Sequence, residues 1–127
     1  MSPARREPRI RVPAAAAPIN SGGDVFGGWV MSQVDIAGSI PAVLCARGRV
    51  ATVAVESMHF RRPVQRGDMV SVYAEVVRTG RTSMTVDVEV VVDRNPENPE
   101  TLTVADARLV YVAVDENGRP RPLPRQD

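Results

Sequence analysis

Only one stretch of this chain can form a long helix, and that stretch is strongly apolar. Apolar side chains cover much of the circumference of residues 28–47, and a helix that is apolar nearly all round is expected to be buried. Gly48 is expected to end the helix. Pro41 has no N–H to donate to Ala37, so we expect a kink or a recapped second segment there. The rest of the chain must cover this helix.

From residue 50 onward the apolar period changes from that of a helix to that of a strand. Within residues 81–92 the even positions from Met84 to Val92 are apolar, whereas Ser83, Thr85, Asp87 and Glu89 are polar. This alternation predicts a sheet with one buried and one solvated face. Further strands are expected at residues 50–60, 69–79 and 101–114. Consecutive strands beside a single helix predict an α+β fold, with an antiparallel sheet wrapped around one long central helix.

The length of 127 residues fits one domain, which we place at residues 19–115. Prolines exclude a helix from the preceding arm, residues 1–18, and allow at most a short edge strand at 9–12. The Pro/Arg-rich tail, residues 116–127, is expected to be mobile or packed on a neighbour. Because a valine-rich strand is rarely left bare at a sheet edge, we expect it to pair with a second copy.

Composition excludes several classes of partner. A net charge of +1 and 4% aromatic residues disfavour nucleic acid. Cys45 is the only cysteine, so no internal disulfide is possible, a zinc site is disfavoured, and a reducing cytoplasm fits best. No segment approaches the roughly 20 apolar residues that would span a bilayer, and the N-terminus lacks the apolar core of a signal peptide. We therefore expect a cytoplasmic protein that binds no membrane and no metal.

A glycine-rich turn leads directly into the helix and suggests a site. Residues 20–28 would aim backbone N–H groups and the positive end of the helix dipole at a ligand. Asp35 then adds a charge where a core-facing helix would have none. The turn and the carboxylate together predict a functional site.

Four motifs in this order resemble the YciA-type bacterial acyl-CoA thioester hydrolases of the hotdog-fold superfamily. The likeness covers residues 19–124. Its motifs are Asn20–Asp35 (N-x-x-GDVFGGWVMSQVD), Gly48–Phe60 (GRVATVAVESM-x-F), Arg62–Asp68 (RPV-x-x-GD) and Val112–Gly118 (VAVD-x-x-G).

The resemblance implies a hotdog fold, a homodimer with joined sheets that usually assembles into hexamers, and hydrolysis of acyl-CoA to free acid and CoA. It implies no cofactor, since coenzyme A is part of the substrate. By position, Asp35 matches the catalytic carboxylate, Gly27 the backbone N–H that polarises the thioester carbonyl, and Asn20 an asparagine that helps to place substrate or water. Some relatives hold the water with a hydroxyl or carboxylate on a strand of the other protomer, and Val53 stands at about that position.

The chemistry explains why these residue types are needed. Thioester hydrolysis passes through a tetrahedral oxyanion, so the site needs a fixed donor for the oxygen and a base or nucleophile. Asp35 could deprotonate water or attack the carbonyl itself, and we favour the general base. Gly27 and Asp35 are eight positions apart, roughly 12 Å along one helix. They cannot hold one carbonyl together, so the two groups of a site must come from antiparallel helices of two protomers.

Arginines and backbone donors at the mouth of the cleft are expected to bind CoA, because arginine pairs bidentately with phosphate. The candidates are Gly28, Arg61, Arg62, Thr79, Gly80, Arg81, Thr82 and Ser83.

Other interpretations compete for single residues and for the whole chain. Asp24 is a second candidate catalytic group but suits a turn residue that satisfies backbone N–H groups. His59, the only histidine, could act in acid–base chemistry, and Glu56 could point into an interface. A non-catalytic acyl-CoA binding or sensing protein is the alternative function. A hotdog dehydratase is disfavoured because the helix offers no histidine beside Asp35.

Overall fold

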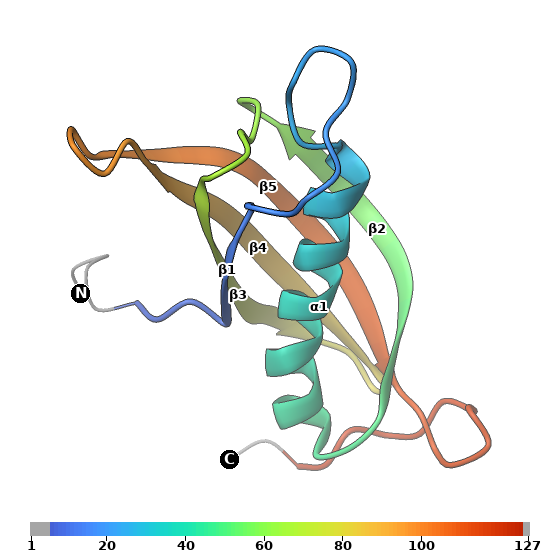
Figure 1. Cartoon of the computed structure of the whole chain (residues 1–127). Coiled ribbons are helices and arrows are strands. Elements are labelled where there is room, and N and C mark those ends of the chain that lie inside the picture. The colour runs from blue at the N-terminus through green and yellow to red at the C-terminus, as the bar shows by residue number, and fades with distance from the viewer. Residues whose placement is uncertain (1–5, 126–127) are drawn as a thin grey trace.

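One long helix lies across a single curved antiparallel sheet (Figure 1). The computed structural model describes residues 6–125. The helix α1 spans Gly27–Ala46. The strands are β1 (Ile10–Pro13), β2 (Val50–Phe60), β3 (Met69–Thr79), β4 (Ser83–Arg94) and β5 (Glu100–Ala113). The predicted α+β architecture and all four long strands are confirmed, two of them with the expected bounds.

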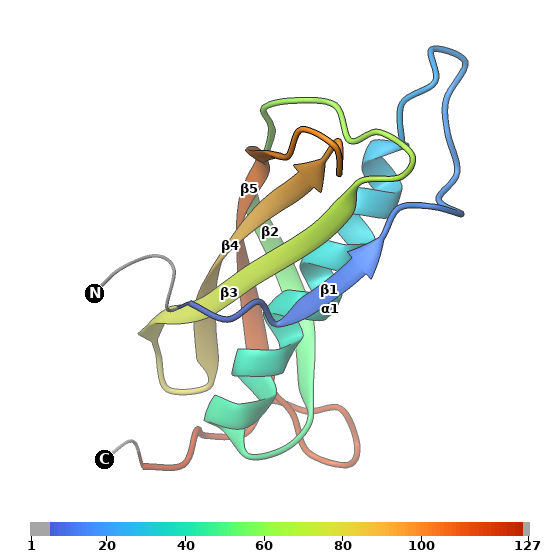
Figure 2. The same ribbon diagram turned by 60° about the vertical axis from the view of Figure 1, so that its left-hand side comes forward.

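The sheet has the order β1-β3-β4-β5-β2, and every neighbouring pair is antiparallel. The short edge strand expected in the N-terminal arm is present as β1, which lies beside β3 (Figure 2). Ala14 and Ala17, which follow β1, are buried in the core. The arm is therefore part of the packed domain from residue 10 onward.

The core lies between α1 and the inner face of the sheet. The even positions of β4 from Met84 to Val92 are all buried, which confirms the predicted alternation. From the helix side, Val30, Val34, Ala37 and Ala42 are buried against them. Helix and sheet therefore bury their apolar faces against one another, as the change of period along the chain requires.

The helix differs from expectation in two respects. It continues from Gly27 through Pro41 to Ala46 as one segment, so the predicted recapped second segment is wrong; Ala37 loses only one intrahelical bond there. Its burial is also incomplete, because Ile36 is 53% and Leu44 66% exposed. The sheet covers only one side of a helix that is apolar on both.

The expectation that no segment is long and apolar enough to span a membrane is wrong for α1, which is long and apolar enough by length and composition. Burial of its residues Val30, Val34 and Ala37 identifies it as the core helix of this fold.

The second edge of the sheet is β2, and it is long and uncovered. Most of its residues are exposed, including Val53 at 56% and Val55 at 45%. Two register shifts against β5 leave Val53 and Glu56 without a paired partner. Such bulges bend a strand and change the direction of its side chains. Apolar side chains are thus exposed both on the edge strand β2 and on the outer side of α1.

Residues 116–125 of the C-terminal tail pack on their own chain, and residues 126–127 lie outside the described part. The Arg121 guanidinium donates to the Ala46 carbonyl at 3.0 Å, at the end of α1. The Leu123 N–H donates to the Arg81 carbonyl at 2.8 Å. In both views the tail passes beneath the C-terminal end of α1 (Figures 1 and 2). It satisfies a carbonyl that a helix end otherwise leaves unpaired.

Candidate active site

Asp35 lies in the middle of α1 and is held by two hydroxyl groups. Thr52 on β2 donates to Asp35 Oδ1 at 2.7 Å. The hydroxyl of Tyr111 on β5 lies 2.8 Å from the Asp35 carbonyl oxygen and 3.1 Å from Oδ1. Among residues 6–125, Asp35 Oδ2 has no donor. One carboxylate oxygen is thus anchored and the other remains available.

The Asp35 side chain lines a cavity of about 300 Å³ between α1 and β2. The walls are mostly apolar and include Met31, Val55 and Met58. Gly28, one of the predicted CoA-binding residues, lies in the same cavity, two helical turns before Asp35. An apolar cavity with one carboxylate suits an acyl chain next to a reactive group.

Gly27 lies at the first position of α1 and lines a different cavity, of about 330 Å³. Within the described residues, no acceptor pairs with the backbone N–H of Gly27 or Gly28. These donors lie at the positive end of the helix dipole. A Cβ on Gly27 would lie 3.2 Å from the ring of Phe60, so the ring packs directly on the glycine. In one chain, then, Gly27 and Asp35 belong to separate cavities.

Asn20 lies beside Gly27 and holds the turn before the helix. Its side-chain oxygen accepts from the backbone N–H groups of Gly22 at 2.9 Å and Asp24 at 3.1 Å. The turn is therefore capped by Asn20 and not by Asp24, for which that role was expected. The Asp24 side chain instead lines the cavity of Gly27.

Arg61 and Arg62 line the same cavity as Gly27. The Arg61 side chain donates to Asp106 at 2.7 Å, and this hydrogen bond holds the pKa of Asp106 below its usual range. Arg62 forms no side-chain ion pair or hydrogen bond with another described residue. Of the two guanidinium groups, that of Arg62 is the more available to a phosphate.

His59 does not belong to this arrangement. Its neighbours Met58 and Phe60 line the cavities on the helix side of the sheet, so the imidazole points to the opposite face. There, Nδ1 lies 3.2 Å from Asp106 Oδ1. In the structure the His59 ring thus contacts Asp106 and not Asp35.

The hairpin from Thr79 to Ser83 lies in none of these cavities. It connects β3 to β4 at the end of the sheet where the tail crosses, and Ala113 N–H donates to the Thr82 carbonyl at 2.9 Å. Arg61 and Arg62 follow the C-terminal end of β2. The hairpin lies near the opposite, N-terminal end of β2, because β5 pairs with both β4 and β2 there. One chain therefore does not bring the two predicted groups of CoA-binding residues together.

A buried ion pair fixes the loop that follows Arg62. Asp68 is 2% exposed and accepts from Arg94 at 2.8 and 2.9 Å. Asp68 also accepts from the Gln65 N–H at 2.8 Å, and Arg94 donates to the Pro63 carbonyl at 3.1 Å. Both Asp68 oxygens and two nitrogens of Arg94 have partners, and these bonds tie the loop that lines the Gly27 cavity to β4.

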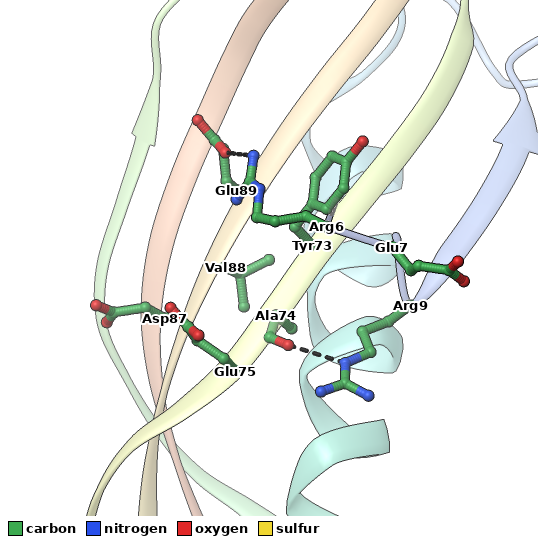
Figure 3. A pocket seen from close by; sticks show the side chains of 9 residues that line it. All are labelled: Arg6, Glu7, Arg9, Tyr73, Ala74, Glu75, Asp87, Val88 and Glu89. Atoms are coloured by element: carbon green, nitrogen blue, oxygen red, sulfur yellow. Dashed lines mark hydrogen bonds and ion pairs between the residues drawn. The ribbon is translucent and has the colours of Figure 1, made fainter. Parts of the chain in front are cut away.

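A third cavity, of about 260 Å³, lies on the face of the sheet away from α1 (Figure 3). The Arg6 guanidinium lies 4.1 Å from the centre of the Tyr73 ring and donates to Glu89 at 2.6 Å. None of the predicted site residues lines this cavity. Among residues 6–125, no group of three or more His, Cys, Asp or Glu side chains could hold a metal ion.

Two residues of the site escaped sequence analysis, Thr52 and Tyr111. From the sequence, Val53 was considered only as the position of a hydroxyl or carboxylate from the other protomer. Within one chain, Val53 is unpaired and 56% exposed, and its neighbour Thr52 reaches Asp35. The sequence features that could have pointed to them were a threonine in an otherwise apolar strand and a tyrosine in a buried strand. Neither sequence position indicates which helical residue it would meet.

Comparison with known proteins identifies the class. Residues 22–97 match the family model of the thioesterase superfamily, so the chain belongs to that superfamily. It is 48% identical to the acyl-CoA thioester hydrolase YciA of Salmonella typhimurium, over 92% of this chain and 90% of the relative. It is 47% identical to YciA of Escherichia coli K12, over 91% of this chain and 89% of the relative.

Two solved structures agree with this family. A hexameric hotdog fold thioesterase of Campylobacter jejuni superposes with a TM-score of 0.89 at 36% identity, covering 93% of this chain and 90% of that one. A hexameric thioesterase of Yersinia pestis gives 0.87 at 43% identity, covering 96% and 98%. The fold is therefore the hotdog fold, as the sequence motifs implied.

Proposed function

We propose that this chain hydrolyses acyl-CoA thioesters to free carboxylic acid and CoA. The observation that carries the proposal is the Asp35 carboxylate, which is anchored through Oδ1 and lines an apolar cavity with Oδ2 unpaired among residues 6–125. Membership of the thioesterase superfamily and relatives called acyl-CoA thioester hydrolases support it. The most economical use of such a carboxylate is general-base catalysis.

In the proposed reaction, Asp35 takes a proton from water, whose oxygen attacks the thioester carbon. The carbonyl oxygen becomes an oxyanion, and the unpaired Gly27 N–H donates to it at the helix N-terminus. The C–S bond then breaks as the oxyanion collapses, and the CoA sulfur takes up the proton held by Asp35 and leaves as a thiol, which regenerates the carboxylate. Asn20, beside Gly27, helps to place the substrate or water with its side-chain amide.

We infer that each active site is shared between two protomers. Gly27 and Asp35 line separate cavities, and eight residues of helix separate them by about 12 Å. The uncovered edge of β2 and the apolar outer side of α1 offer a surface on which a second chain would bury both. A homodimer is therefore the proposed catalytic unit. Assembly of dimers into a hexamer is proposed because the compared thioesterases are hexameric.

For CoA, we propose that Arg62 contacts a phosphate, with Arg61 beside it. The two arginines lie with Gly27 at one end of the protomer. The Gly28 N–H, next to Gly27 in the chain, would add a donor, and the hairpin from Thr79 to Ser83 would complete the nucleotide site from the partner protomer. We propose a cytoplasmic location, which a chain with a single cysteine suits, and a reaction without a further cofactor.

The test is turnover of a panel of acyl-CoAs of different chain length, followed by release of free thiol. Wild-type protein should turn over, and Asp35→Asn should lower kcat by about 10²- to 10⁴-fold, the contribution of a general base. A loss of less than about tenfold would contradict the role of Asp35. Stoichiometric binding of acyl-CoA without thiol release would instead support a non-catalytic acyl-CoA sensor.

A further inference from the structure

The hydroxyl of Tyr111 is buried beneath the candidate catalytic carboxylate. Tyr111 belongs to β5 and is fully buried. Its oxygen lies 2.8 Å from the Asp35 carbonyl oxygen and 3.1 Å from Asp35 Oδ1. A buried tyrosine hydroxyl needs one acceptor, and the backbone carbonyl alone would satisfy it. The contact with the carboxylate goes beyond that need.

The helix is shaped to admit this hydroxyl. A Cβ on Gly38 would overlap the Tyr111 oxygen and lie 3.1 Å from its ring, so only glycine allows the approach. Glycine in the interior of a helix is destabilising relative to alanine. Its presence one turn after Asp35 is thus explained by the tyrosine that docks there.

The tyrosine and a threonine act on the same carboxylate oxygen. Thr52 donates to Asp35 Oδ1 at 2.7 Å from the strand next to that of Tyr111. Burial, followed by the neighbouring Asp35 charge, raises the pKa of the Tyr111 phenol well above its usual range, so the hydroxyl remains a donor. The Thr52 proton on Oδ1, together with the Tyr111 proton shared between Oδ1 and the Asp35 carbonyl, fixes the rotation of the carboxylate and leaves Oδ2 without a donor among residues 6–125.

We propose that Tyr111 is a positioning residue for the reaction: with Thr52 it anchors Oδ1 of Asp35, so that Oδ2 is presented to the attacking water. The proposal rests on the proposed thioester hydrolysis. A base displaced by a fraction of an ångström loses efficiency without a change in substrate affinity. The role of Tyr111 should therefore be visible in kcat and not in KM.

The test compares Tyr111→Phe with Tyr73→Phe, which removes the other tyrosine hydroxyl of the chain, on the far face of the sheet. Tyr111→Phe should lower kcat by about 10- to 100-fold with KM within about twofold, as expected for a lost hydrogen bond to a charged group. Tyr73→Phe should leave both unchanged. A kcat within about twofold of wild type for Tyr111→Phe would overturn the proposal. Thr52→Val should reproduce the kcat effect while keeping the side-chain shape.

A second readout does not require turnover. The infrared difference spectrum between wild-type protein with ¹³C-labelled aspartate and its Asp35→Asn variant isolates the carboxylate stretch of Asp35. This band should shift in the Tyr111→Phe background and remain in place in the Tyr73→Phe background. An unshifted band would overturn the positioning role. If wild-type protein fails to hydrolyse acyl-CoA, the proposed function falls, and the band still decides whether Tyr111 acts on Asp35.

Discussion

Replacement of Gly27 by proline removes one N–H group and little else. Gly27 is the first residue of α1, where proline is well tolerated because its missing N–H would have no intrahelical partner. The preceding residue, Phe26, has φ −58° and ψ 138°, the extended conformation that proline favours before it. The Gly27 N–H has no acceptor within residues 6–125, so no structural hydrogen bond is lost.

The matched control is Gly27→Ala, which keeps the N–H. Both variants add a Cβ that lies 3.2 Å from the ring of Phe60, a side chain exposed enough to move aside. The ratio of their rates therefore isolates the donor. Loss of one oxyanion donor costs about 10²- to 10³-fold in kcat, or about 2.7–4 kcal/mol of transition-state stabilisation.

The assay is thiol release from saturating acyl-CoA, with circular dichroism to verify equal helix content. Gly27→Pro should be about 10²- to 10³-fold slower than Gly27→Ala, and Gly27→Ala should be close to wild type. If the two variants turn over at the same rate, the Gly27 N–H does not stabilise the oxyanion.

Three further outcomes are expected. Arg62→Gln should raise KM for acyl-CoA about tenfold with little change in kcat, because a phosphate contact binds ground and transition states alike; steady-state kinetics would contradict this if kcat alone fell. Asp68→Asn should lower the free energy of unfolding by about 3 kcal/mol in urea titration, because it breaks a buried pair with Arg94, whereas the exposed Asp87→Asn should cost less than about 1 kcal/mol. Arg108 holds the pKa of Asp87 in the folded protein below its usual range, so this stabilisation is present above about pH 4 and is lost as the pH falls through the pKa of the folded protein. On acidification, wild type should therefore lose more stability than Asp87→Asn. Equal losses would contradict the pairing.

The secondary structure was predictable because each element has a strong local signal. The alternation in β4 matches the burial of its even positions from Met84 to Val92, and β2 and β3 begin and end where expected. Pro41 was overestimated as a break, because α1 tolerates the loss of one hydrogen bond when its inner face is packed. Local patterns thus predicted the elements better than their interruptions.

The site was only half predictable. Asp35 was recognisable as a charge in an apolar helix, but its partners Thr52 and Tyr111 lie 17 and 76 positions away along the chain. The docking of Tyr111 depends on the missing side chain of Gly38, which a sequence pattern does not connect to it. The exposed apolar side of α1 was also missed, since periodicity shows that a side chain is apolar and not what covers it.

The most direct test of the shared active site is complementation between two inactive variants. The variants Asp35→Asn and Gly27→Pro are mixed in equal amounts, unfolded and refolded together. Thiol release by the mixture is then compared with that of each variant refolded alone. If each site takes Gly27 from one protomer and Asp35 from the other, half of the dimers are mixed and one of their two sites is intact, so the mixture should recover about a quarter of wild-type activity. Activity no greater than that of the separate variants would show that both groups act within one chain and would contradict the account.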